Sequence, residues 1–129
     1  MEKIAEIMTK DVLTVPSDMP LKMAIDILVI RKISGLPVVD SRMELKGIIT
    51  ERDMMEVLLN KQSLEGKVVS DYMTTTVHSF SSSDTIVNVC KFLFDNPIRR
   101  VPIVDNNKLV GIVSRRDIIA LLAKEENDE

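Results

Sequence analysis

The sequence has very few of the residues on which disulfides and nucleic-acid surfaces depend. Cys90 is the only cysteine in 129 residues. No internal disulfide can therefore form, and we expect an intracellular, cytoplasmic protein in which Cys90 is a small buried group on a helix. The formal net charge is −3, whereas binding to a nucleic-acid backbone requires a concentrated basic surface. The charge therefore argues against nucleic acid as a partner.

Long apolar stretches are absent as well. No apolar run approaches the roughly 20 residues that span a bilayer, and the opening residues, MEKIAEIMTKD, lack the apolar segment of a signal peptide. We expect no association with a membrane.

The side chains of most catalytic sites are equally scarce. His78 is the only histidine and lies twelve residues before Cys90, and no further ligand cluster accompanies them. The four glycines form neither a Walker loop nor a G-x-G-x-x-G motif. Catalysis would need a positioned nucleophile and base, a metal cluster or a cofactor motif. The sequence therefore predicts neither an enzyme nor a metal site.

What the chain does contain is a repeat. A shift of 65 residues places Ile7-Met8-Thr9 on Tyr72-Met73-Thr74, and SGLPVVD (34–40) on RRVPIVD (99–105). With one residue fewer in the next turn, GIITERD (47–53) falls on GIVSRRD (111–117). The order and spacing of these matches predict two repeats, at residues 6–60 and 71–123, joined by a linker at 61–70.

Each repeat is predicted to fold as β-α-β-β-α. A short strand is expected at 12–15 and at 76–80. The first helix begins near Pro20 in one repeat and is capped by Asp84 in the other, with apolar residues at helical spacing. Two strands and a final helix follow. Because about 55 residues bury too little surface to fold well alone, we expect an α+β, sandwich-like protein with the repeats related by a pseudo-two-fold axis.

The final helices have more apolar surface than one buried face requires. The segments DMMEVLLN and DIIALLAK carry apolar residues on two sides. We expect part of this surface to pack on a second copy of the chain, as a homodimer.

A hydroxyl residue ends the last strand of each repeat, and an aspartate follows three residues later at the start of the final helix: Thr50 with Asp53, and Ser114 with Asp117. This spacing is typical of a capping box. It also suits a nucleoside phosphate, because a helix N-terminus attracts phosphate and an aspartate can accept both hydroxyls of a ribose. The residues alone leave both interpretations open.

Arginines gather around the second of these corners. Arg115 and Arg116 follow Ser114, and Arg99 and Arg100 precede the strand that begins at a proline. Arginine side chains bind phosphate through paired donors, so these four could neutralise a phosphate chain.

The repeated motifs M-T, G-L-P-V-V-D with R-V-P-I-V-D, and G-I-I-T-E-R-D with G-I-V-S-R-R-D resemble those of tandem CBS domains, a pair of which is called a Bateman module. The resemblance covers residues 6–123. It implies a stand-alone, non-catalytic regulatory module that binds AMP, ADP, ATP or S-adenosylmethionine in clefts between the repeats and passes occupancy to a partner by rearrangement. The alternative is a ligand-free interaction or dimerisation module.

Carried over by position, the resemblance implies that a nucleotide binds the second corner through Ser114, Asp117, Ile112, Arg99 and Arg100. The adenine is expected against the other repeat, at Met8, Asp11, Leu13, Ser34, Gly35 and Leu36.

The symmetric cleft would use Thr50, Asp53, Ile48, Ser34 and Gly35, with a base pocket near Met73, Thr76, His78, Arg100 and Val101. His78 would contact the base there or be an ordinary surface residue. Glu51 replaces Arg115, and Ser34-Gly35 replaces Arg99-Arg100, so this cleft carries less positive charge. We expect the tighter polyphosphate site at Asp117.

Overall fold

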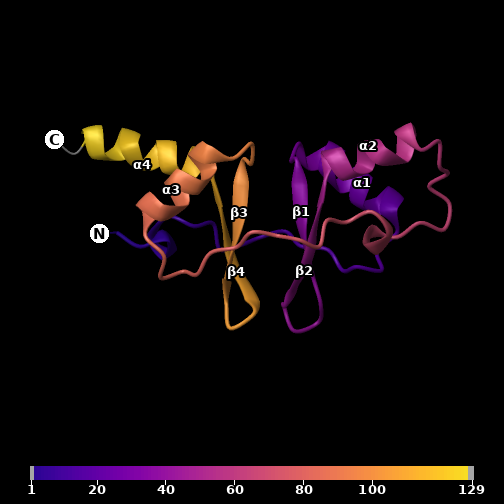
Figure 1. Cartoon of the computed structure of the whole chain (residues 1–129), viewed down its shortest axis with the longest axis horizontal. Coiled ribbons are helices and arrows are strands. Elements are labelled where there is room, and N and C mark those ends of the chain that lie inside the picture. The colour runs from indigo at the N-terminus through magenta and orange to yellow at the C-terminus, as the bar shows by residue number, and fades with distance from the viewer. Residues whose placement is uncertain (1, 128–129) are drawn as a thin grey trace. The chain divides into compact units, whose positions relative to one another are not determined.

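The computed structural model describes residues 2–127 of the chain and has a mixed α and β architecture (Figure 1). Its helices and strands follow the order α1 (Leu21–Arg31), β1 (Gly35–Val39), β2 (Leu45–Thr50), α2 (Glu51–Leu59), α3 (Ile86–Asp95), β3 (Arg100–Asp105), β4 (Lys108–Ser114) and α4 (Arg115–Asn127). Short 3-10 helices lie at Ile4–Glu6 and Val69–Asp71. The predicted α+β class with two like repeats is confirmed. None of the helices in the described part is long and apolar enough to cross a bilayer.

The chain folds into two compact units whose boundaries differ from those of the sequence repeats. The first unit comprises residues 13–77, and the second combines the first twelve residues with the chain from His78 onward. Each repeat's first residues thus belong to the unit of the other repeat, and backbone pairing is the cause. Thr9, at the start of the first repeat, pairs with Ile112 on β4, and Thr74, at the start of the second, pairs with Ile48 on β2.

Each unit is built on an antiparallel hairpin. β1 pairs with β2, with Leu36 opposite Ile49, and β3 pairs with β4, with Val101 opposite Val113. Val15 adds one parallel bridge to Val38 in the first unit, and Phe80 adds the same bridge to Ile103 in the second. The strands predicted at 12–15 and 76–80 are thus reduced to a single bridging residue each.

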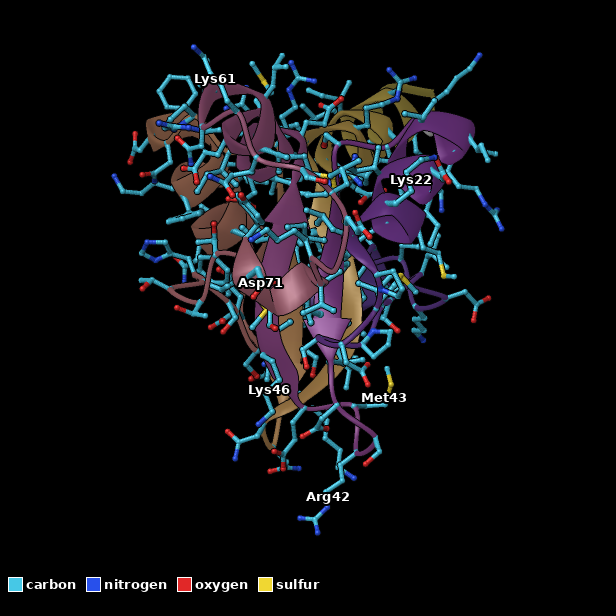
Figure 2. The ribbon with its side chains drawn as sticks, turned by 90° about the vertical axis from the view of Figure 1, so that its right-hand side faces the viewer. Lys22, Arg42, Met43, Lys46, Lys61 and Asp71 are labelled. Carbon is cyan, nitrogen blue, oxygen red and sulfur yellow. The ribbon has the colours of Figure 1, made fainter. Side chains whose placement is uncertain are left out.

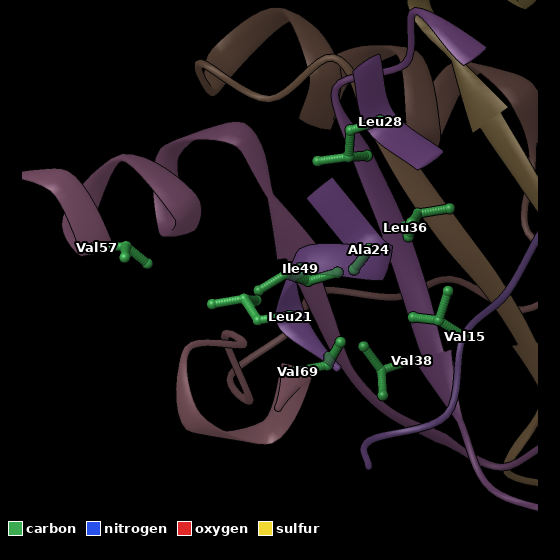
Figure 3. Close-up of a cluster of buried hydrophobic side chains, with 9 residues drawn as sticks. All are labelled: Val15, Leu21, Ala24, Leu28, Leu36, Val38, Ile49, Val57 and Val69. Carbon is green, nitrogen blue, oxygen red and sulfur yellow. The ribbon is translucent and has the colours of Figure 1, made fainter. Parts of the chain in front are cut away.

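The first unit encloses its own hydrophobic core. Leu21, Ala24 and Leu28 are buried along one face of α1, at the helical spacing seen in the sequence. All of β1 is buried. Figure 3 shows the cluster that α1 and β1 form with β2, α2 and the neighbouring segments: Val15, Leu21, Ala24, Leu28, Leu36, Val38, Ile49, Val57 and Val69.

The second unit has an equivalent core made from α3, α4 and the β3–β4 hairpin. Ile4 from the N-terminal segment is fully buried in it. Its other buried members are Ile86, Val89, Leu93, Val101, Ile103, Val113 and Ile118.

Two local predictions for α3 are wrong. Cys90 is exposed, because Ile86, Val89 and Leu93 form the buried face and position 90 lies to the side of it. The N-cap is Thr85, whose hydroxyl accepts from the Asn88 N–H. Asp84 instead accepts a 2.8 Å hydrogen bond from the Ser81 N–H, so it stabilises the preceding turn.

The final helices expose much of their apolar surface, as their sequences predict. On α2, Val57 is buried whereas Met55, Leu58 and Leu59 are 63%, 81% and 75% exposed. On α4, Ile118 is buried and both Ile119 and Leu122 are exposed. That a second copy covers these side chains stays a prediction.

An aspartate at the end of β1 and of β3 organises the neighbouring turn. Asp40 accepts the backbone N–H groups of Arg42 and Glu44, in the hairpin turn whose tip carries Arg42 and Met43 (Figure 2). Asp105 accepts the Ser81 hydroxyl at 3.1 Å, the Ser82 N–H at 3.0 Å and the Ser82 hydroxyl. Asp105 thereby ties the turn before α3 to the β3–β4 hairpin.

We predict that Ser82→Ala raises the pKa of Asp105. The hydroxyl and then the N–H of Ser82 are the main causes that hold this pKa below the usual aspartate value. A carboxylate with a lowered pKa stabilises the fold above its unfolded pKa, about 3.9, and the contribution is lost as the pH falls through the folded value. Carboxyl-carbon NMR titration measures the shift, with exposed Ser79→Ala as the control. An unchanged Asp105 titration in Ser82→Ala contradicts the assignment.

Gly47→Ala is expected to destabilise the protein more than the equivalent Gly111→Ala. A Cβ at Gly47 would lie 2.7 Å from the Thr74 carbonyl oxygen, which is part of the backbone. A Cβ at Gly111 would lie 2.7 Å from Met8 Sδ, which belongs to a flexible side chain, and 3.0 Å from the Thr9 carbonyl oxygen. Overpacking of this kind costs about 1–3 kcal/mol. Urea denaturation of both variants measures the difference, and an equal or larger loss in Gly111→Ala would refute it.

Candidate functional site

The two hydroxyl–aspartate corners lie where a strand runs directly into a helix. β2 ends at Thr50 and α2 begins at Glu51, and β4 ends at Ser114 and α4 begins at Arg115. Thr50 keeps extended backbone angles, φ −121° and ψ 166°. The first amides of each final helix are therefore presented at the end of a strand, where a helix leaves donors without partners inside the helix.

Both corners form the capping box that their sequences predict. The Thr50 N–H donates to Asp53 Oδ2 at 2.8 Å, and the Asp53 N–H donates to Thr50 Oγ1 at 3.2 Å. The corresponding distances for Ser114 and Asp117 are 2.8 and 3.2 Å. Each hydroxyl also donates to Oδ2 of the same aspartate. Capping thus uses only one carboxylate oxygen, Oδ2, and leaves Oδ1 for another donor.

The second carboxylate oxygen differs between the corners. Asp53 Oδ1 accepts a hydrogen bond from the Thr74 hydroxyl at 2.9 Å, and the backbone pairing of Thr74 with Ile48 holds that residue in place. Thr9 has the matching pairing with Ile112. Within the described residues, however, Asp117 Oδ1 accepts no hydrogen bond, because every bond to this carboxylate goes to Oδ2. Among the described residues, Oδ1 is therefore occupied at Asp53 and free at Asp117.

The charge around the two corners also differs. Arg100 lies directly opposite Ser114 across the β3–β4 pair, and its Nε is buried without a hydrogen-bond partner among the residues that the structure describes. Gly35 lies opposite Thr50 in the first unit. A Cβ there would come within 3.3 Å of the Ile49 carbonyl oxygen and Thr50 Cγ2, so this corner has little room for a longer side chain. Arg99 is exposed, as is Arg116.

Arg115 does not serve the role that its sequence position suggested. Its Nε donates to the Ile98 carbonyl at 3.0 Å, and its Nη2 donates to the carbonyls of Leu93 at 3.0 Å and Asn96 at 2.9 Å. These donors are therefore unavailable to a phosphate. Sequence analysis missed this arrangement, for which Asn96-Pro97 at the end of α3 is the available signal.

The other candidate residues are divided between the units. Within the second unit, Ile112 lies on β4 close to the corner, Met8 packs on Gly111 beside it, and Asp11 is exposed in the N-terminal segment. Within the first unit, the backbone of Ile48 pairs with that of Thr74, and the Ser34 carbonyl accepts the Glu51 N–H at 2.9 Å. Leu13 and Thr76 are exposed.

Three candidates have surroundings that limit what they can contact. Leu36 and Val101 are each 1% exposed and belong to the two cores, so their side chains are not available to a ligand. The exposed His78 ring lies 5.1 Å from that of Phe92, between centroids, which places it beside α3.

The sequence model of the CBS domain family matches the chain twice, at residues 4–60 and 69–124. The chain belongs to the CBS domain family. It is 32% identical over 96% of its length to the uncharacterized protein MJ1225 of Methanocaldococcus jannaschii, of which it spans 44%. The chain covers less than half the length of the first curated relatives that it matches.

Solved CBS-pair structures have the same fold over nearly their whole length. CBSX2 of Arabidopsis thaliana, crystallised in complex with AMP, has a TM-score of 0.87 at 26% identity, with 98% of this chain and 99% of that one covered. The CBS domain pair of protein MJ0100, in complex with 5-methylthioadenosine and S-adenosyl-L-methionine, has a TM-score of 0.81 at 28% identity, with 97% and 98% covered.

Asp53→Ala should destabilise the ligand-free protein more than Asp117→Ala. Both variants lose a capping box, but only Asp53→Ala also loses the hydrogen bond from the Thr74 hydroxyl. One such hydrogen bond contributes roughly 1 kcal/mol. Urea denaturation measures the two losses. Thr74→Val and Thr9→Val provide matched controls. Thr74→Val should lower the free energy of unfolding only when Asp53 is present, and Thr9→Val should lower it less than Thr74→Val does. Equal losses for the two aspartate variants would contradict the asymmetry.

Proposed function

We propose that this chain is a non-catalytic regulatory module that binds an adenosine nucleotide at the Ser114–Asp117 corner and passes its occupancy to a partner protein. Two structural relatives support the class of ligand, because CBSX2 was crystallised with AMP and the MJ0100 pair with two adenosine-containing thio compounds. Adenosine is the group common to these ligands, and AMP, ADP, ATP and S-adenosylmethionine all contain it.

The observation that carries the proposal is the buried, unpartnered Nε of Arg100. A buried donor of a charged side chain without an acceptor is costly, and most such groups in proteins are satisfied. Arg100 lies opposite Ser114, at the N-terminus of α4, where amides and helix dipole favour an anion. A phosphate oxygen would supply the missing acceptor, and the Ser114 hydroxyl could turn from Asp117 Oδ2 to donate to it, while the Ser114 N–H keeps its bond to Oδ2.

Asp117 completes this proposed nucleotide site with an acceptor for the sugar. Its Oδ2 holds Ser114, which fixes the side chain, so that Oδ1 can accept from the ribose hydroxyls. The first corner offers less, because Thr74 already donates to Asp53 Oδ1 and Gly35 stands where the second corner has an arginine. We therefore place the principal site at Asp117.

A ligand can regulate only through its differential affinity for two arrangements of the protein. In the proposed mechanism, the nucleotide favours one arrangement of the repeats or of a homodimer, and the partner recognises that arrangement. The exposed side chains of Met55, Leu58 and Leu59 provide an apolar surface for such contacts. The same surface favours the second candidate function, a ligand-free interaction or dimerisation module.

Adding AMP, ADP, ATP or S-adenosylmethionine should raise the melting temperature of the purified, ligand-free protein. A ligand at 100 times its dissociation constant stabilises the folded state by about 2.7 kcal/mol. Asp117→Ala should abolish the shift because it removes the acceptor for the ribose. Differential scanning calorimetry at several ligand concentrations measures both effects.

Asp95→Ala is the control for this titration, because Asp95 is an exposed residue on α3 whose partner is Lys91. It should keep the full ligand shift. If no adenosine compound changes the melting temperature of the unaltered chain, the ligand-free interaction module becomes the better account.

A further inference from the structure

The equivalent helices α1 and α3 end in different ways. α1 ends at Lys32, which has left-handed backbone angles of φ 55° and ψ 45°. The N–H groups of Lys32 and Ile33 both donate to the Leu28 carbonyl, so the backbone closes its own last turn. The C-cap residue of α3, Asn96, instead has extended angles, φ −126° and ψ 150°, and its backbone N–H and side-chain amide both donate to the Phe92 carbonyl. The chain therefore turns away from α3 after closing on Phe92 alone.

Pro97 is the cause of the difference. A residue that precedes proline is excluded from helical angles and forced towards an extended conformation, which Asn96 adopts. Proline also brings no N–H that could close the turn. The matching residues at the end of α1 are Arg31 and its C-cap Lys32, which have no such restriction. Asn96 satisfies the Phe92 carbonyl, and the carbonyls of Leu93 and Asn96 take their donor from elsewhere in the chain.

Arg115 is that donor. Its guanidinium reaches the carbonyls of Leu93 and Asn96 at the end of α3, and that of Ile98 beyond Pro97, at 2.9–3.0 Å. The planar group carries several donors in a rigid fork, and its positive charge suits a helix C-terminus. In the first unit the same position is Glu51, whose carboxylate has only acceptors and cannot cap carbonyls.

These contacts lie on the segment that leads into the second corner. The backbone N–H of Arg115 also donates to the Arg99 carbonyl at 2.9 Å. The Arg115 side chain thus holds Asn96 and Ile98, and its backbone holds Arg99 as the Glu51 backbone holds Ser34 in the first unit. The next residue of that segment is Arg100, with its unpartnered Nε.

We infer that Arg115 is a positioning residue, which holds the segment 96–100 so that Arg99 and Arg100 meet the phosphate of a ligand at Ser114. This inference rests on the proposed function. Binding is tighter when the groups that contact a ligand are held in place beforehand, because less conformational freedom is lost. Arg115 contributes to phosphate recognition without touching the phosphate.

The affinity ratio of AMP to adenosine distinguishes this role from a purely structural one. A cap that only stabilises α3 would lower the melting temperature and leave the ratio unchanged. We expect Arg115→Gln to reduce the ratio about tenfold, equivalent to about 1.4 kcal/mol, with adenosine affinity kept within about twofold. Arg115→Lys should restore part of the ratio, because an ammonium group still donates to carbonyls. Isothermal titration calorimetry on the full chain measures all affinities.

Arg42→Gln is the matched control, since Arg42 is an exposed arginine in the β1–β2 turn (Figure 2) and its loss removes the same charge. It should leave the AMP-to-adenosine ratio unchanged. If Arg115→Gln keeps the wild-type ratio, or if Arg42→Gln lowers it equally, the positioning role is overturned.

Amide hydrogen exchange tests, without any ligand, whether Arg115 holds the segment 96–100 in place. Exchange at residues 98–100 should accelerate in Arg115→Gln and stay at the wild-type rate in Arg42→Gln. Unchanged exchange in Arg115→Gln overturns the inference even if the chain binds AMP. If the unaltered chain binds neither AMP nor adenosine, the proposed function and the phosphate role of Arg115 both fail, and exchange still decides whether Arg115 holds the segment.

Discussion

The hydrogen-bonded pair of a hydroxyl and an aspartate at each strand-to-helix corner is the constraint on which the rest of the structure depends. It ends the strand and begins the helix without an intervening loop, which brings helix amides to the edge of the hairpin. The aspartate uses Oδ2 for this purpose, so its position is already determined before a ligand arrives. Capping through Oδ2 therefore leaves Oδ1 of Asp117 available to the proposed ligand.

The same corner, built twice, has acquired two different environments. In the first unit Thr74 donates to Asp53 and glycine stands opposite Thr50, so the corner is satisfied by the protein's own groups. In the second unit Asp117 keeps an oxygen without a donor among the described residues, and Arg100 keeps a buried donor without an acceptor. One corner thus keeps an acceptor and a donor without partners. A nucleotide would satisfy both, because its ribose hydroxyls would donate to the acceptor and its phosphate would accept from the donor.

Much of the fold follows from local patterns in the sequence. The internal repeat predicted the two hairpins, the final helices and both capping boxes, because capping depends on residues three apart. Helical spacing predicted that Leu21, Ala24 and Leu28 share a buried face of α1, but Val29, which fits the same spacing, is 70% exposed. The errors fell where the local pattern was ambiguous: Cys90 lies beside the buried face of α3, and Thr85 is the cap in place of its neighbour Asp84. The expected strands at 12–15 and 76–80 form only one bridge each, at Val15 and Phe80.

The sequence by itself determined that the chain is a tandem repeat with a hydroxyl–aspartate corner in each half, and that the second half carries more arginine. Only the tertiary structure decided what those groups contact. It assigned Arg115 to the carbonyls of α3, Thr74 to Asp53, and left Arg100 Nε without a partner. These contacts join residues about 20 positions apart. Their formation depends on where α3 ends and on how a preceding or following segment pairs with a hairpin, which no local spacing specifies.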